Sequence, residues 1–364
     1  MNLYALLEKG FPKNREDCAL ETPEGLFYTW RDIDRATAMM ANLLKSLNLP
    51  SGSRVAVQVE KSPEALFLYL ATLRAGFVYL PLNTAYQESE IQYFIENSEP
   101  AVVVCSPKNF SWVSKIAFKA GTKNVFTLDE NRTGSLLERS VHCSDQFNTV
   151  TRTNDDLAAI LYTSGTTGRS KGAMLTHGNL GSNALVLNQF WGWKKGDVLL
   201  HALPIFHVHG LFVAAHGALI NGSKMIWLPR LDTAQLIKYL PCSTVMMGVP
   251  TFYVRLLMDQ NFNKAVCKNM RLFVSGSAPL LTETFNNFQK LSGHTILERY
   301  GMSETVMLVS NPYEGARIGG SVGVVLPGVE VRVVNESGQS CGPDEIGGIE
   351  VRGPNIFKGY WRMP

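Results

Sequence analysis

Short apolar runs, separated by segments long enough to form helices, constrain the fold of this chain more than any other feature. Parallel strands that are covered on both faces read as continuous apolar runs, and they need long, usually helical, connections. Three such runs lie in the first half of the chain and four in the second; they span residues 54–59, 78–82, 101–105, 198–203, 224–228, 243–247 and 271–275. The pattern predicts βαβ units and therefore an α/β fold.

The segments between and after these runs carry their own boundary signals. Pro63 stands at a first helical position and Gly76 closes the same helical pattern. From about residue 322 the chain alternates apolar and polar residues on both sides of a turn at 336–338, which predicts an antiparallel hairpin. We therefore expect a first α/β subdomain over 1–155, a second over 156–321 and a small β subdomain over 322–364.

Composition narrows the class of protein. Hydrophobic residues make up 45% of the chain and charged residues 18%, with a net charge of +3, as in globular and not in disordered proteins. So small a surplus forms no basic stripe, and we expect no nucleic-acid partner. There is no 18-residue apolar run, and residues 1–9 lack the features of a signal peptide, so we expect no membrane partner and a cytoplasmic location. The six cysteines are scattered without a C-x-x-C pair, which indicates reduced thiols.

The sharpest local motif spans residues 161–172, where an apolar run is followed by five Ser and Thr residues, three glycines and Lys171. Glycines let backbone N–H groups approach an anion, hydroxyls add donors, and the lysine adds a point charge. A polyphosphate is the ligand that this combination favours. The spacing is not that of a P-loop, because Gly172 and not Ser or Thr follows the lysine. The alternative is a flexible surface turn.

Five blocks, in this order along the chain, together resemble the adenylate-forming superfamily of acyl-CoA synthetases, luciferases and peptide-synthetase adenylation domains. They are residues 163–172, 202–207, 275–280, 300–305 and 348–361. The resemblance covers essentially the whole chain. It implies the large N-terminal domain of such enzymes, with two βαβ-type sheet–helix subdomains and a small distorted β-barrel.

The resemblance also implies a two-step reaction that uses ATP, Mg²⁺ and coenzyme A. A carboxylate attacks the α-phosphate of ATP to give acyl-AMP and pyrophosphate, and a thiol then displaces AMP. The first step depends mostly on positioning and charge neutralisation. Lys171, His207 and Glu304 are the catalytic residues that it implies, with Glu304 as the Mg²⁺ ligand because hard cations prefer carboxylate and phosphate oxygens.

The nucleotide site that the resemblance implies has two sides. The residues expected around the β- and γ-phosphates are Thr163, Ser164, Gly165, Thr166, Thr167, Gly168 and Lys171. Those expected around the adenine and the α-phosphate are Gly276, Ser277, Ala278, Glu298, Tyr300, Gly301, Met302 and Ser303. Tyr300 would stack on the base. Ser303 stands where the family usually has threonine, and it keeps the hydroxyl that would contact the α-phosphate.

Arg299 departs from the family pattern, in which many relatives carry a small or neutral residue just before the Tyr-Gly-Met block. This departure bears on which acid is the substrate. A guanidinium that faces a small pocket is costly unless the substrate neutralises it, and it grips a second carboxylate bidentately. Residues 297–304, 80–86 and 201–211 resemble malonyl-CoA synthetases. We therefore expect a small dicarboxylate, malonate or methylmalonate, with Arg299 on its distal carboxylate. The alternative is a structural pairing of Arg299 with Glu298 or a buried neighbour.

Four of the seven histidines, His201, His207, His209 and His216, fall within 16 residues. A zinc site is the alternative interpretation, but no Cys, Asp or Glu lies within the cluster. From its block, His207 is expected as a wall of the acyl pocket. His209 and Ser277 are expected to contact the acid, although a core-packed His209 fits the sequence equally well.

Three other cationic residues lie outside the five blocks. Arg255 lies on a helical pattern, where a solvated helix-face arginine is the favoured interpretation and a contact with the acid the alternative. Lys61 and Arg74 are interpreted as surface charges.

Two other functions remain open at this stage. A carrier-loading adenylation enzyme would use a phosphopantetheine thiol of a carrier protein in trans, and a nucleotide-binding or regulatory fragment would have no turnover. Proteins that resemble this chain continue with an Asp for the ribose, a hinge and a small C-terminal domain that carries a lysine. We therefore expect a truncated chain without its C-terminal domain, which binds ATP weakly and turns over poorly.

Overall fold

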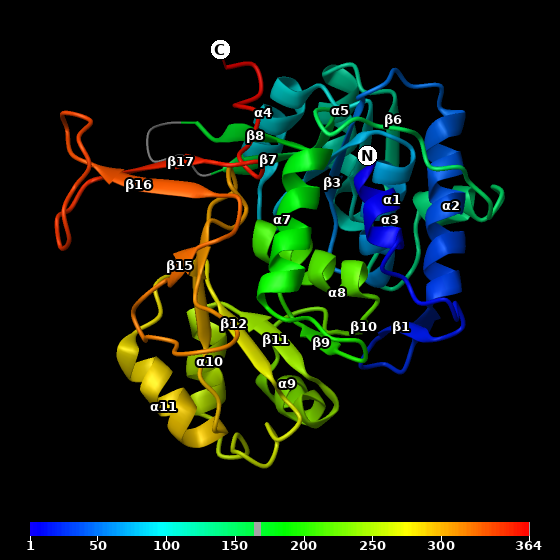
Figure 1. The fold of residues 1–364 in the computed structure, drawn as a ribbon. Helices are drawn as coiled ribbons and strands as arrows, with labels where there is room; N and C mark the ends of the chain where they lie inside the picture. Colours follow the sequence, from blue (N-terminus) through cyan, green and yellow to red (C-terminus); the bar gives the residue numbers. More distant parts are fainter. Residues whose placement is uncertain (164–168, 364) are drawn as a thin grey trace.

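Two sheets of mainly parallel strands organise the chain, and helices cover them (Figure 1). They are seen in a computed structural model that describes residues 1–163 and 169–363. Within that part, the first sheet has six strands and the second has nine. The α/β class predicted from the apolar runs is confirmed.

The first sheet has the strand order β6-β5-β3-β4-β7-β8. Its strands are β3 (Arg54–Gln58), β4 (Val78–Pro81), β5 (Val102–Cys105), β6 (Asn124–Thr127), β7 (Leu157–Thr163) and β8 (Lys171–Thr176). Val55 and Val57 pair in parallel with both β4 and β5 and are buried, as expected where both faces of a sheet are covered. β7 and β8 run antiparallel, so that Thr163 lies opposite Lys171.

The second sheet has the strand order β15-β14-β13-β12-β11-β9-β10-β1-β2. Its strands are β1 (Cys18–Glu21), β2 (Phe27–Thr29), β9 (Val198–His201), β10 (Lys224–Trp227), β11 (Val245–Gly248), β12 (Leu272–Ser275), β13 (Leu297–Tyr300), β14 (Val309–Ser310) and β15 (Val324–Val325). The strands from β13 to β1 pair in parallel, and the pairs at the two edges are antiparallel. Loops that follow parallel strands meet at one edge of the sheet, where open α/β sheets bind their ligands.

The two sheets exchange segments across the expected boundary at 155/156. β1 and β2, near the N-terminus, extend the second sheet through the pairing of Leu20 with Met225. β7 and β8, from beyond the boundary, complete the first sheet through the pairing of Tyr79 with Ala159. The boundary therefore does not separate the sheets, because edge strands pair with whichever sheet offers open hydrogen-bonding groups.

Helices pack on both sheets. The α-helices are α1 (Leu3–Glu8), α2 (Trp30–Ser46), α3 (Pro63–Arg74), α4 (Glu88–Ser98), α5 (Phe110–Lys119), α6 (Ser135–Ser140), α7 (His177–Phe190), α8 (His216–Asn221), α9 (Thr233–Tyr239), α10 (Pro250–Leu257) and α11 (Thr282–Ser292). Short 3₁₀ turns cover Pro107–Asn109 and Leu240–Cys242, and a π-helical turn covers His209–Ala215. No helix in the described part of the chain has both the length and the apolar character needed to cross a membrane.

Helix α3 shows how the boundary signals work. The Ser62 hydroxyl accepts a hydrogen bond from the backbone N–H of Ala65 at 3.1 Å, and Pro63 occupies the first helical position. Gly76 takes the positive φ (+74°) that ends the pattern. The helix packs against α1, α2 and β4, and all of its residues are buried. Arg74, interpreted as a surface charge, is therefore buried, because its guanidinium donates to Asp34 Oδ1 at 3.0 Å.

The hairpin predicted in the last part of the chain is present as β16 (Glu330–Val334) and β17 (Gly348–Arg352). Its turn closes with a hydrogen bond from the Gly338 N–H to the Asn335 carbonyl at 2.9 Å. Figure 1 shows this hairpin projecting from the body of the molecule. Among the described residues it pairs with no other sheet, whereas β15 (Val324–Val325), from the same expected subdomain, joins the second sheet.

Candidate active site

The residues expected to meet the acid converge on one cavity beside β13. The cavity has a volume of about 410 Å³. Its polar lining comes from His207, His209, Ser277, Arg299 and Ser303, and its apolar lining from Leu203, Pro204, Val208, Val249, Met302 and Met307, with Gly210 and Gly301 between them. Arg299 comes from β13 itself, and the segments that follow β9, β11, β12 and β13 contribute the other residues. The second sheet therefore supplies the cavity at the ends of its central strands.

Arg299 lies in β13 and is 3% exposed. Among the residues that the structure describes, its Nε and Nη2 atoms have no hydrogen-bond partner and its guanidinium forms no ion pair. Burial lowers the pKa of Arg299 to about 9, opposed by the nearby Tyr253. An arginine stays protonated under physiological conditions, so Arg299 is a buried cation that no carboxylate of the described residues neutralises.

Neighbouring residues shape the space around this guanidinium. A side chain at Gly276 would collide with it, so only glycine allows the loop after β12 to pass so close. Glu298, next along β13, does not pair with Arg299; its Oε1 accepts a hydrogen bond from the Leu280 backbone N–H at 3.1 Å. The interpretation of Arg299 as a partner of Glu298 is thus not what the structure shows. Glu298 instead holds the end of the loop that contains Gly276.

The loop after β12 has backbone strain at one residue. Ser277 is exposed and has a positive φ of +71°, a conformation in which a residue with a side chain is uncommon and which clusters at functional sites. Its hydroxyl lies 3.4 Å from His209 Nδ1. Ala278 follows it and is also exposed.

His209 begins the π-helical turn and lines the cavity. Its ring is buried, and among the described residues its Nε2 has no partner. Burial, reinforced by the charge of Arg299, holds the pKa of His209 well below its usual range, so the imidazole is neutral. His207, by contrast, is exposed and lies against the ring of Phe206 with 4.6 Å between ring centroids.

The other two histidines of the cluster, His201 and His216, form hydrogen bonds with residues outside the acid cavity. His201 Nδ1 lies 2.8 Å from Lys61 Nζ, and His216 Nε2 shares a 2.7 Å hydrogen bond with the Tyr69 hydroxyl. In the described part of the chain no three His, Cys, Asp or Glu side chains gather where they could hold a metal ion. The four histidines that are close in the sequence therefore contact different groups in the folded chain.

The end of β13 and the loop after it carry the residues expected around the adenine, the α-phosphate and the metal ion. Tyr300 is half-buried at the end of the strand, while Met302 is exposed and Ser303 half-buried. A side chain at Gly301 would collide with the Val306 carbonyl, so the tight turn requires glycine. Glu304 is buried at 8% exposure.

The expected phosphate-binding loop connects β7 to β8. Thr163 ends β7 and Lys171 opens β8 directly opposite it, so both ends of the loop are fixed by the first sheet. The residues between them to which a phosphate-binding role is assigned, Ser164, Gly165, Thr166, Thr167 and Gly168, lie outside the described residues.

Tyr360 links the two halves of the site, and sequence reasoning assigned it no role. Its hydroxyl donates to Glu304 Oε1 at 2.8 Å, and Lys171 Nζ lies 5.2 Å from the centroid of its ring. Burial and this hydrogen bond raise the pKa of Tyr360 to about 12, so the phenol stays protonated. The only signal in the sequence was that Tyr360 falls inside the last family-like block.

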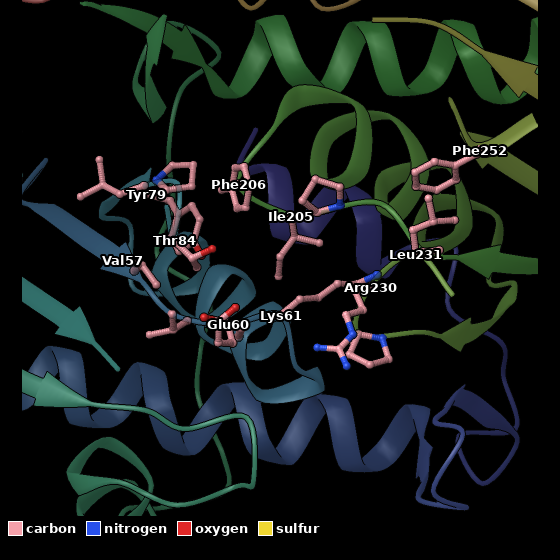
Figure 2. A pocket seen from close by; sticks show the side chains of 17 residues that line it. Val57, Glu60, Lys61, Tyr79, Thr84, Ile205, Phe206, Arg230, Leu231 and Phe252 are labelled. Atoms are coloured by element: carbon pink, nitrogen blue, oxygen red, sulfur yellow. The ribbon is translucent and has the colours of Figure 1, made fainter. Parts of the chain in front are cut away.

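A second cavity, of about 250 Å³, lies on the other side of Pro204. Figure 2 shows Ile205 and Phe206 facing Glu60 and Lys61 across it. Lys61 was interpreted as a surface charge, and this is wrong. Its side chain is buried, hydrogen-bonded to His201 and stacked 4.4 Å over the ring of Trp227. Arg255, the secondary candidate for the acid, is exposed on α10 and does not line the acid cavity.

The fold and this arrangement of side chains define a known class of protein. Residues 8–361 match the family model of the AMP-binding enzymes, and the chain belongs to that family. Its fold is the N-terminal domain of adenylate-forming enzymes, so the family and fold predicted from the five blocks are confirmed.

Several relatives and solved structures are similar to this chain over most of its length. The mitochondrial malonate–CoA ligase of Mus musculus is 37% identical over 335 residues, which cover 81% of this chain and 56% of that protein. The crystal structure of ATP-bound MatB from Rhodopseudomonas palustris is 50% identical with a TM-score of 0.97, over 100% of this chain and 72% of that chain. A malonyl-CoA ligase in a product complex with methylmalonyl-CoA and AMP is 30% identical with a TM-score of 0.81, over 98% and 73%. The chain thus spans little more than half the length of the curated relative.

Proposed function

We propose that this chain is the nucleotide- and acid-binding part of an AMP-forming acid–thiol ligase that activates malonate. The observation that carries the proposal is the Arg299 guanidinium, buried, without a counter-ion among the described residues, and lining a cavity of about 410 Å³. Similarity to malonate–CoA ligases supports the choice of acid.

The acid fits the cavity by charge. One carboxylate of malonate accepts hydrogen bonds from Arg299, whose Nε and Nη2 are without partners among the described residues, in the bidentate geometry that guanidinium favours. The neutral ring of His209 and the Ser277 hydroxyl line the same space. A monocarboxylic acid of similar size would leave the buried cation uncompensated, which disfavours it strongly.

The other carboxylate of the acid is the nucleophile. One of its oxygens attacks the α-phosphorus of ATP, the bond to the β-phosphate oxygen breaks, and pyrophosphate leaves. Thr163, Lys171 and the loop between them would hold the β- and γ-phosphates, with Tyr300 against the adenine and Ser303 at the α-phosphate. His207, which is exposed and lines the cavity, would contact the reacting carboxylate. These residues act by holding two anions in line and by offsetting their charge.

Glu304 fits the role of a Mg²⁺ ligand. It is a buried carboxylate, and the hydrogen bond from Tyr360, whose ring lies under Lys171, occupies only one of its oxygens. Mg²⁺ commonly binds through one or two carboxylates together with substrate phosphates. The ion would supply charge neutralisation on the phosphates, while Glu304 and Lys171 would fix the position of the polyphosphate.

Coenzyme A is the acceptor in the proposed second step, in which its thiol sulfur bonds to the acyl carbonyl and AMP leaves. A carrier-protein thiol is distinguished from it by offering the two acceptors to the acyl-AMP in parallel. Cytoplasmic location stays a prediction.

The substrate proposal is tested by pyrophosphate release in single turnovers, with the chain in excess over ATP because slow turnover is expected. Malonate, methylmalonate, acetate and hexanoate are compared on the wild type, Arg299→Ala and the control Arg255→Ala. We expect release with malonate, a smaller or similar rate with methylmalonate, and loss of about 30-fold or more in Arg299→Ala only. Equal activity with hexanoate, or an Arg299→Ala variant that behaves like the control, would contradict the proposal.

A further inference from the structure

The last described segment of the chain ties together two parts of the site that come from different sheets. Residues 355–361 lie between the loop after β13 and strand β8. On the side of the loop after β13, Asn355 Nδ2 donates to the Thr305 carbonyl at 2.7 Å, and the Phe357 N–H donates to the Glu304 carbonyl at 2.8 Å. The backbone around Glu304 is therefore held from one side by this segment.

The same segment continues as an added strand along β8. The Lys358 N–H donates to the Met174 carbonyl at 2.8 Å, the Met174 N–H to the Gly359 carbonyl at 3.0 Å, and the Trp361 N–H to the Gly172 carbonyl at 2.8 Å. The indole N–H of Trp361 also donates to the Asn97 carbonyl on α4 at 3.1 Å. Because β8 begins at Lys171, this pairing fixes the strand that presents the lysine.

Tyr360 lies where the two attachments meet. Its ring is under the Lys171 ammonium and its hydroxyl is on the Glu304 carboxylate. Among the described residues Lys171 and Glu304 form no ion pair with each other or with any other side chain. A cation above an aromatic face and a carboxylate at the phenolic O–H are both favourable contacts. The phenol thus satisfies the two opposite charges separately.

We propose that Tyr360 is a positioning residue that holds Glu304 and Lys171 apart and aimed at one ligand, the magnesium complex of ATP. The inference rests on the proposed function, and it deepens it by naming a residue that acts through Glu304. Without the phenolic hydroxyl, the carboxylate is free to turn toward Lys171 and neutralise it. Both groups would then be less available to a metal ion and to phosphate.

The test uses equilibrium binding, so it does not depend on turnover. A fluorescent ATP analogue is titrated into the 364-residue chain, once with magnesium and once with EDTA in its place. In Tyr360→Phe, which keeps the ring beneath Lys171, we expect binding with magnesium to weaken about 3- to 10-fold and binding with EDTA to change by less than about 2-fold. The thermal midpoint should stay within a few degrees of the wild type.

Two controls separate positioning from a general loss of structure. Tyr28→Phe removes the same kind of hydrogen bond, from a tyrosine hydroxyl to the Glu64 carboxylate. Neither Tyr28 nor Glu64 belongs to the proposed nucleotide site, so this variant should leave nucleotide binding unchanged. In a Glu304→Gln background, Tyr360→Phe should have no further effect, because residues that act through one another are not additive.

The outcomes are distinct. Unchanged binding in Tyr360→Phe, an equal loss with magnesium and with EDTA, or a full additional loss in the Glu304→Gln background would each overturn the inference while leaving malonate activation intact. A magnesium-specific loss together with no preference for malonate would support the inference and contradict the proposed acid. A wild type that binds no nucleotide would overturn both.

Discussion

A buried arginine without a counter-ion is unfavourable to the free protein, because removing a charge from water is repaid only by a well-placed partner. Arg299 has no such partner among the described residues, and its environment is closed further by Gly276. Groups that are unfavourable for folding concentrate at functional sites. The proposed second carboxylate of the acid is the partner that would complete the pair.

Replacing Arg299 with methionine should therefore stabilise the folded chain while weakening the binding of the dicarboxylic acid. The apolar side chain fills a similar volume without a charge, so we expect the free energy of unfolding to rise by about 1 kcal/mol or more. Urea unfolding of the wild type and Arg299→Met measures this. A decrease of similar size would show that the guanidinium is stabilised in the free protein and does not await a ligand.

Gly276 offers an independent check on the same contact. Gly276→Ala places a methyl group against the guanidinium, and we expect a loss of about 1–3 kcal/mol from overpacking. The loss should be smaller in an Arg299→Ala background, where the space is free. Equal losses in the two backgrounds, again by urea unfolding, would place the collision elsewhere.

The sequence predicted which individual residues would line the acid cavity, but it did not predict some of the side-chain contacts that these residues make. One cavity is lined by Arg299, His207, His209 and Ser277. Each of them lies in or next to a short sequence motif that follows a strand of the second sheet, so its place could be predicted from local sequence. Tyr360 was missed since its partner Glu304 is 56 positions away. A long-range contact between two side chains leaves no periodicity in the sequence.

At the scale of elements, the layers on the two sheets meet through buried polar groups. Helix α3 packs on the first sheet and α8 belongs to the second part of the chain, and Tyr69 of α3 shares a hydrogen bond with His216 of α8. Burial lowers the pKa of His216 to about 3. Burial, helped by Arg152, lowers that of His177 on α7 to about 4. Both histidines are therefore neutral when the chain is folded.

These two histidines predict the response to acid. An unfolded histidine has a pKa of about 6.5, so between that value and the folded value the unfolded chain binds protons that the folded chain does not. Their contribution to stability is complete above pH 6.5 and falls as the pH drops, by about 1.4 kcal/mol per pH unit for each histidine. His216→Gln should reduce the slope of unfolding free energy against pH between 6.5 and about 4.5 by that amount. The exposed His142→Gln serves as control, and equal slopes in wild type and His216→Gln would contradict the assignment.

Elements with strong local signals were predicted and those that depend on distant partners were not. The Val-rich runs became β3 and β5, and Pro63 and Gly76 bound α3 as expected. Strand β1 was missed because four residues carry little pattern, and its pairing with β10 joins positions about 200 residues apart, Leu20 and Met225. The burial of Lys61 likewise depends on His201 and Trp227 from the other sheet.

At the scale of the whole molecule, the site is divided between the two sheets. The second sheet supplies the acid cavity and Glu304, and the first supplies Lys171 and both ends of the loop before it. Residues 355–361 join them through backbone hydrogen bonds to each. We propose that this divided site selects a small dicarboxylic acid by the charge of Arg299.

Calorimetric titration of malonate, acetate and hexanoate into the 364-residue chain, saturated with magnesium and a non-hydrolysable ATP analogue, measures this selectivity. We expect malonate to bind at least about 10-fold more tightly than either monocarboxylic acid. This preference should disappear in Arg299→Met and persist in the exposed-arginine control Arg255→Met. Equal binding of the three acids to the wild type, or an unchanged preference for malonate in Arg299→Met, would contradict it.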